Sequence, residues 1–78
     1  MTRSGFLRVM EEMLGVPIRT LRDEDSRETV AKWTSLADVQ IFSLITGEFG
    51  IEPDGELIEA ETVGDLLLVL QRKGAFRE

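Results

Sequence analysis

Residues 34–51 decide the fold, and they read Thr-Ser-Leu-Ala-Asp-Val-Gln-Ile-Phe-Ser-Leu-Ile-Thr-Gly-Glu-Phe-Gly-Ile. This stretch predicts a helix that begins at Thr34 or Ser35 and ends near Phe49, because Gly50 follows and is expected to end the helix. Its apolar residues step by three and four positions, which is the spacing of one buried helix face. The expected members of this face are Leu36, Val39, Phe42, Ile45 and Phe49, widened by Ile41 and Leu44.

An earlier helix is expected from about Ser4 to Leu14. Its apolar residues recur every four positions, as on one stripe of a helix. They are Phe6, Met10 and Leu14, flanked by Leu7 and Met13. Ser4 is a candidate cap for the start, and Gly15 is suited to the end because glycine tolerates the left-handed conformation. Phe42 and Phe49, two helical turns apart in the later helix, should both pack against Phe6, Met10 and the apolar stripe from Leu66 to Leu70.

The last helix has the clearest start signal of the chain. Thr62 is a good cap, and Asp65 three residues later can return a hydrogen bond to the backbone of the cap residue. Gly74 is expected to mark the end of this helix. Its apolar face is expected to hold Val63, Leu66, Leu67 and Leu70. Between Pro53 and Thr62, residues 56–60 are expected to form one short helical turn.

Between Val16 and Thr34 the apolar residues have no regular spacing, which predicts a long loop. Apolar residues are scattered through this acidic segment and suggest that it is pinned across the helices. They are Ile18, Leu21, Val30 and Trp33. The predicted fold class is therefore all-α, with residues 1–78 forming one domain. Three main helices and one short turn make a small bundle, with the long loop between the first two helices.

Composition excludes several functions. The 78 residues include no cysteine and no histidine, so thiolate or histidine metal sites and the common histidine acid–base machinery are ruled out. We therefore expect a non-catalytic protein and no metal site. The net charge of −6 leaves no basic patch for nucleic acid and favours basic protein surfaces as partners. No secretory signal or bilayer-spanning stretch is evident, and we expect a cytoplasmic monomer without membrane contact.

Three short motifs carry a resemblance to a known family. They are Trp33-Thr34-Ser35-Leu36 at the start of the predicted middle helix, Glu48-Phe49-Gly50-Ile51 at its end, and Thr62-Val63-Gly64-Asp65-Leu66 at the start of the last helix. In this order and at these separations they resemble the acyl carrier proteins, and the resemblance covers nearly the whole chain.

The resemblance implies that Ser35 carries a covalent 4′-phosphopantetheine arm that holds acyl groups as thioesters. It also implies a phosphopantetheinyl transferase, an acyl-loading ligase and acyl-processing enzymes as partners, in fatty-acid, polyketide or related biosynthesis. The expected docking residues for these partners lie on the helix that Ser35 opens. They are Leu36, Asp38, Val39, Gln40 and Glu48. Leu36, which follows the serine, is expected to lie between surface and core and to anchor the modifying enzyme.

Thr34 departs from the family pattern, which has aspartate before the serine. This departure keeps open a specialised carrier with its own transferase, or an unmodified carrier-like helical adaptor that uses the same helix only to dock partners. Ser35 could also be a simple helix cap, since serine and threonine are common there. A third alternative, a peptidyl or aminoacyl carrier of a nonribosomal pathway, usually has Gly-Gly and His or Asp before the serine. Ala31 and Lys32 do not match that signature.

The acidic loop raises one further alternative, a calcium site. If Asp23 and Asp25 were the first ligands of an EF-hand loop, Glu28 would stand where that loop needs glycine, and Thr34 would replace its final glutamate. A solvated run of charges is the better interpretation.

Overall fold

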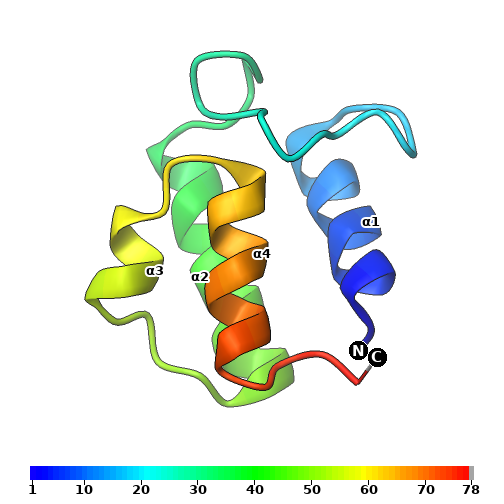
Figure 1. Ribbon diagram of the computed structural model, residues 1–78. Helices are drawn as coiled ribbons and strands as arrows, with labels where there is room; N and C mark the ends of the chain where they lie inside the picture. The colour runs from blue at the N-terminus through cyan, green and yellow to red at the C-terminus, as the bar shows by residue number, and fades with distance from the viewer. Residues whose placement is uncertain (78) are drawn as a thin grey trace.

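The computed structural model describes residues 1–77, which form four helices and no β-strand (Figure 1). The helices are α1 (Arg3–Leu14), α2 (Ser35–Phe49), α3 (Gly55–Glu59) and α4 (Val63–Arg72). In Figure 1, α2 lies behind α4, α3 lies beside this pair, and α1 lies on the opposite side. The prediction of an all-α bundle with three main helices and one short turn is confirmed.

Residues 15–34 link α1 to α2 without a helix and pass over one end of the bundle (Figure 1). Three apolar side chains of this segment are buried in the core: Leu21, Val30 and Trp33. Ile18 is 57% exposed instead and lies outside the core. The buried side chains hold the segment against the helices, because each removes apolar surface from water.

The backbone of the same segment caps the start of α4. The N–H of Val63 donates to the carbonyl oxygen of Asp25 and the N–H of Gly64 to that of Asp23, both at 2.9 Å. A β-carbon on Gly64 would lie only 3.1 Å from the Cβ atom of Asp23 and 3.2 Å from its carbonyl oxygen. Glycine at this position therefore lets the loop approach the helix closely enough to form both bonds.

Two of the predicted helix starts are confirmed. Thr62 caps α4 by accepting from the N–H of Asp65, while the Asp65 carboxylate accepts from the N–H of Thr62. Thr34 caps α2, and its hydroxyl accepts from the N–H of Ala37. The prediction that Ser4 caps the first helix is wrong. Thr2 holds that position, because its hydroxyl lies 3.0 Å from the N–H of Gly5 at the third helical residue.

The helix ends follow the glycines. Gly15 has φ 68° and Gly74 has φ 73°, the left-handed conformation that glycine adopts without strain. Beyond Gly74, the N–H of Ala75 donates to the carbonyl oxygen of Leu70, which turns the chain back along the bundle. Phe76 then lies 5.9 Å from the ring centre of Phe6.

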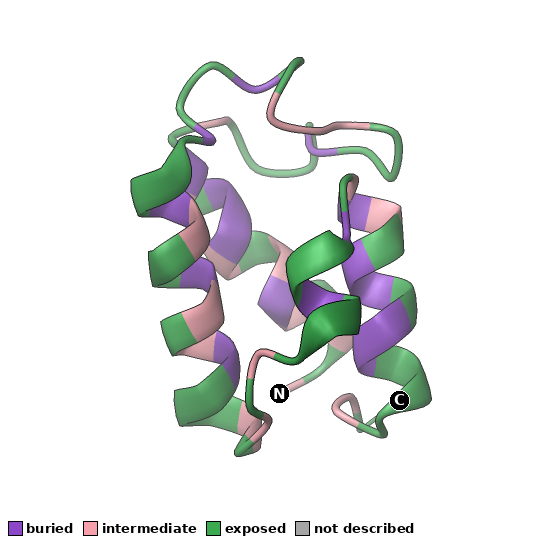
Figure 2. Ribbon diagram, turned by 90° about the vertical axis from the view of Figure 1, so that its left-hand side faces the viewer, coloured by how far each residue is buried: buried purple, intermediate pink, exposed green. Residues whose placement is uncertain are grey.

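The core lies between α1, α2 and α4 (Figure 2). Its fully buried large side chains come from all four helices and are Phe6, Met10, Leu14, Ile41, Ile45, Leu57, Val63, Leu67 and Leu70. Phe49 packs on this core with its ring centre 5.8 Å from that of Phe6, as expected, and Phe42 is half-buried against it.

The prediction that Leu36 and Val39 lie on the buried face of α2 is wrong. They are 67% and 62% exposed, and the buried residues of α2 are Ala37, Ile41 and Ile45. At 100° per residue, Leu36 and Val39 point almost opposite to Ile41. Because apolar residues occur nearly all round this helix, their spacing alone did not select the face that packs.

Candidate functional site

Ser35 is the first residue of α2 and is exposed to solvent. Thr34, not Ser35, fills the capping position, so the hydroxyl of Ser35 is not needed to close the helix start. That hydroxyl forms no hydrogen bond with any of residues 1–77. The structure thus separates the two roles that the sequence left open, the cap at Thr34 and an accessible hydroxyl at Ser35.

A three-residue cluster fixes the chain around Ser35. The Arg27 guanidinium donates to both oxygens of the Asp38 carboxylate, from Nε at 2.9 Å and from Nη2 at 2.8 Å. The indole Nε1 of Trp33 donates to the same carboxylate at 2.7 Å. The guanidinium carbon of Arg27 also lies 5.3 Å from the centre of the Trp33 ring, within the range of a cation–π contact.

This cluster joins the loop to the first turn of α2. Arg27 and Trp33 belong to the loop, whereas Asp38 is one helical turn after Ser35. Trp33 is only 4% exposed, so its indole packs against the bundle while its polar edge reaches Asp38. Charge-assisted bidentate bonds of this kind are among the stronger polar contacts in proteins. The cluster therefore restrains the backbone on both sides of Ser35.

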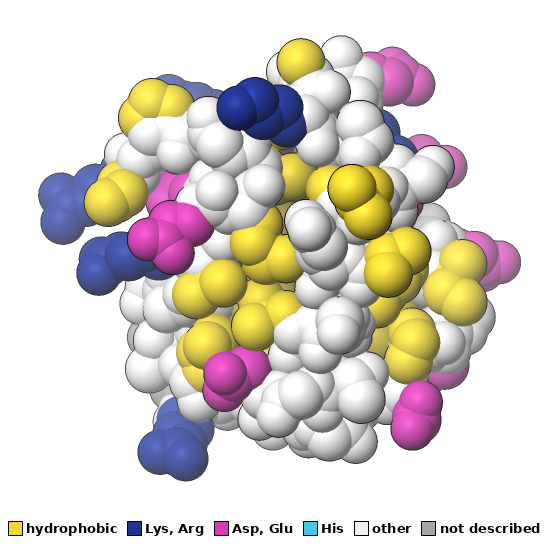
Figure 3. Space-filling view, turned by 180° about the vertical axis from the view of Figure 1, so that it is seen from behind, with side chains coloured by type: hydrophobic (Ala, Val, Ile, Leu, Met, Phe, Trp, Pro, Cys, Tyr) yellow, Lys and Arg dark blue, Asp and Glu magenta, His cyan; other side chains and the backbone are white. Residues whose placement is uncertain are grey.

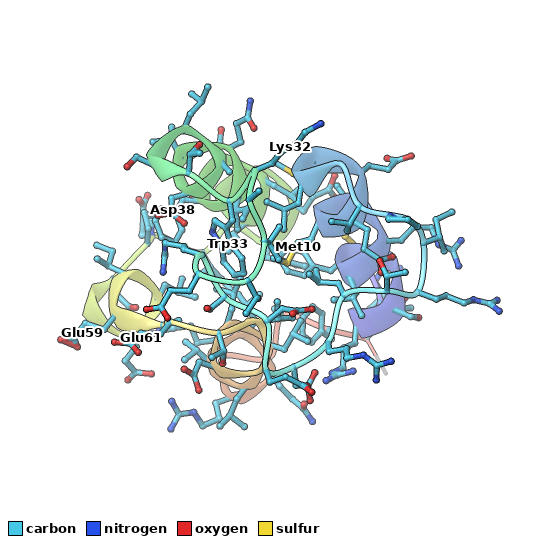
Figure 4. The ribbon with its side chains drawn as sticks, turned by 90° about the horizontal axis from the view of Figure 1, so that it is seen from above. Met10, Lys32, Trp33, Asp38, Glu59 and Glu61 are labelled. Carbon is cyan, nitrogen blue, oxygen red and sulfur yellow. The ribbon has the colours of Figure 1, made fainter. Side chains whose placement is uncertain are left out.

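Viewed from above, Trp33 lies between Lys32, on the side of α1, and Asp38, on the side of α3 (Figure 4). Glu59 and Glu61 lie further away on the α3 side in the same view. The start of α2 has a partial positive charge from its unpaired N–H groups, which favours an anion nearby. The negative charge of Asp38, which would oppose an anion there, is compensated by Arg27.

The sequence-predicted docking residues divide into two groups. Leu36, Val39, Gln40 and Glu48 are exposed, as docking requires. Asp38 is different, because its side chain is 23% exposed and both carboxylate oxygens bind partners within the chain. From behind, where α2 is nearest the viewer, hydrophobic side chains spread over the middle of the surface (Figure 3).

A small gap lies beneath the Arg27–Asp38 pair, between α2, α3 and α4. Its volume is about 10 Å³, too small to hold more than about one water molecule. Apolar side chains form most of its lining: Trp33, Ile41, Phe42, Leu57, Ala60 and Leu66. The space between these helices is therefore filled in this structure.

Sequence reasoning missed two charged residues that shape this region. The sequence did not identify Arg27 as important, because its partner Asp38 is 11 residues further along the chain and no local motif predicts such a pair. Glu11 is 2% exposed, and its Oε2 accepts from the N–H groups of Thr20 and Leu21 at 3.0 and 3.1 Å. A signal existed for Glu11, since it stands between Leu7 and Leu14 on the apolar stripe of α1.

Among residues 1–77, no helix has the length and apolar character needed to cross a membrane. A search of protein-family models, curated proteins and solved structures finds no match to this chain.

Proposed function

We propose that this chain is a carrier protein of the acyl carrier type, with 4′-phosphopantetheine attached to Ser35. In the attachment step the hydroxyl oxygen of Ser35 attacks the β-phosphorus of coenzyme A. A new P–O bond forms, adenosine 3′,5′-bisphosphate leaves, and the hydroxyl proton passes to a base of the transferase. The thiol at the end of the arm then supplies the nucleophile that a chain without cysteine lacks.

The observation that carries the proposal is the unbonded, exposed hydroxyl of Ser35 at the start of α2. A serine that served only as a cap would accept a hydrogen bond from the first turn, and here Thr34 does so. Ser35 is therefore available to a modifying enzyme without loss of the helix cap.

The charge distribution around Ser35 also supports a phosphodiester at this position. The backbone N–H groups at the start of α2 suit a phosphate oxygen. Because Arg27 pairs with Asp38, the nearest carboxylate on α2 does not act as an uncompensated negative charge. The bidentate pair also holds the loop in place while Ser35 is presented to a partner.

Leu36 and Val39 support a docking role for the same face. With 100° between successive residues, Ser35, Leu36 and Val39 share the side of α2 opposite Ile41. Both apolar side chains are more than half exposed, and exposed apolar groups beside a reactive residue favour contact with a partner protein. We propose that the transferase and the acyl-processing enzymes contact Leu36 and Val39, together with Gln40 and Glu48.

Intact mass spectrometry tests the attachment. After incubation with coenzyme A and a broad-specificity phosphopantetheinyl transferase, the wild-type chain should gain one phosphopantetheine. Ser35→Ala should gain none, whereas Ser43→Ala, which changes another exposed serine of α2, should be modified like wild type. Thr34→Asp should speed the reaction if the residue before the serine limits it. Modification of Ser35→Ala would refute the assignment.

The alternative is an unmodified helical adaptor, and the exposure of Leu36 and Val39 favours it as much as it favours a carrier. The two functions separate in the same experiment. If neither wild type nor Thr34→Asp gains mass, the adaptor is favoured. Partner binding that depends on Leu36 and survives Ser35→Ala would then support it.

A further inference from the structure

The side of α2 that points away from the core has no charged residue. Successive residues of a helix are 100° apart, so the residues opposite Ile41 form this side, which we call the α2 face. Its members are all exposed: Ser35, Leu36, Val39, Gln40, Ser43, Thr46 and Gly47. Surface helices normally place charged residues on their outward side, as α1 does with Arg8 and Glu12. In a chain with 31% charged residues, an uncharged outward face is characteristic of a contact surface.

Leu36 and Val39 form the apolar part of the α2 face. Their side chains are 67% and 62% exposed, so they offer apolar area that a partner can cover. They are three residues apart and therefore neighbours on the helix surface. Figure 3 shows this side of the molecule, with hydrophobic and uncharged side chains over its middle and most charged side chains towards its edges. Covering this area would favour binding, because it removes apolar surface from water.

Gly47 is not required at its position by the fold. A β-carbon there would meet nothing within 4 Å, although glycine inside a helix lowers stability relative to alanine. A glycine on an exposed helix lets the backbone of another protein approach closely. Gly47 therefore agrees with a contact surface that extends along the helix from Ser35.

Only two carboxylates belong to α2, and neither offers a free charge beside Ser35. The Asp38 side chain is 23% exposed, and both of its oxygens accept hydrogen bonds from Arg27. Glu48 is exposed but lies 13 residues after Ser35, about 20 Å along the helix axis. A basic partner surface would therefore lose hydration at the α2 face without gaining an ion pair near the serine.

We propose that the transferase meets the α2 face with an apolar, uncharged surface of its own, and that burial of Leu36 and Val39, not ion pairing, holds the two proteins together. The inference rests on the proposed function for the identity of the partner and adds which contacts bind it. A second copy of this chain fits the face less well, because two chains with a net charge of −6 repel each other.

Isothermal titration calorimetry of the Ser35→Ala chain with a broad-specificity phosphopantetheinyl transferase tests this proposal. Ser35→Ala has no acceptor hydroxyl, so the titration measures binding without the transfer step. Raising NaCl from about 150 to about 500 mM should change the Kd less than about two-fold, because salt screens exposed ion pairs and not apolar contacts. Adding Leu36→Ala should raise the Kd about five- to twenty-fold, since it removes part of the apolar area that the partner covers.

Two controls in the same Ser35→Ala chain change exposed residues outside the α2 face. Leu68→Ala truncates a leucine of α4 that is 56% exposed. The double change of Glu59→Gln with Glu61→Gln removes two exposed carboxylates on the α3 side of the molecule (Figure 4). Each control should leave the Kd within about two-fold of that of its parent.

Four results would overturn the proposal: no measurable binding, a larger rise of the Kd with salt, equal effects of Leu36→Ala and Leu68→Ala, or a larger effect of the double glutamine change than of Leu36→Ala. A wild-type dimer in light scattering that Leu36→Ala abolishes would also overturn it, because a second copy would then cover the face. The proposed function fails separately. If Ser35→Ala binds as expected but the wild-type chain gains no mass with coenzyme A, attachment at Ser35 is wrong and the contact chemistry still holds.

Discussion

Replacing Glu11 by alanine should destabilise the fold far more than an exposed glutamate on the same helix would. The Glu11 carboxylate is almost fully buried and accepts from the N–H groups of Thr20 and Leu21. Hydrogen bonds to a charged group contribute about 1.5–3 kcal/mol each, and a buried donor without a partner costs about 1–3 kcal/mol. Because both bonds share one oxygen and the Thr20 bond is only partly buried, we expect a total loss of about 2–4 kcal/mol.

That loss is a large part of the stability expected for 78 residues, about 4–12 kcal/mol. Urea unfolding followed by circular dichroism measures it. With a slope of about 1 kcal/mol per M, the midpoint should fall by about 2–4 M. Glu12→Ala, one residue along and exposed, should change stability by less than about 0.5 kcal/mol. Equal midpoints for the two variants would contradict the role given to the buried carboxylate.

Two further predictions concern α4 and α3. Gly64→Ala should lower the free energy of unfolding in urea by about 1–2 kcal/mol, because the new methyl group crowds Asp23. In the control variant Gly47→Ala the new methyl group meets nothing within 4 Å, so this change should stabilise the fold by up to about 1 kcal/mol. Equal effects of the two changes would refute the close approach of the loop to Gly64. The hydrogen bond from Lys73 lowers the pKa of the Asp54 carboxyl below its ordinary value. Asp54 therefore stabilises the fold above its ordinary pKa and loses this contribution as pH falls through the lowered pKa. In carboxyl NMR titrations Lys73→Met should raise that pKa, and Arg72→Met, whose partner is Glu56, should not.

The helix ends could be predicted because their causes are local. Thr62 and Asp65 form a capping box within four residues, and the glycines after α1 and α2 adopt the left-handed conformation that ends a helix. The start of α1 shows the limit of such reasoning. Thr2 and Ser4 are both residue types that cap helices, and the local sequence does not distinguish them, although Thr2 is the cap in the structure.

Long-range contacts could not be predicted in the same way. The bond from Arg27 to Asp38 and the approach of Asp23 to Gly64 join residues far apart in the sequence, and no periodic pattern encodes them. The exposure of Leu36 and Val39 on α2 was not predicted for a related reason. Leu36 and Val39 have the hydrophobicity of core residues, so composition assigns them to the core unless the partner helices are known.

The indole of Trp33 gives the molecule a native optical reporter two residues before Ser35. It is the only tryptophan in the chain, its N–H is bonded to Asp38, and a guanidinium lies over its ring. Its fluorescence emission therefore originates from a single site, and release of the loop from α2 would expose the ring to water and shift that emission to longer wavelength. Any change that moves the loop at this end of α2 could thus be followed in real time without attaching a dye.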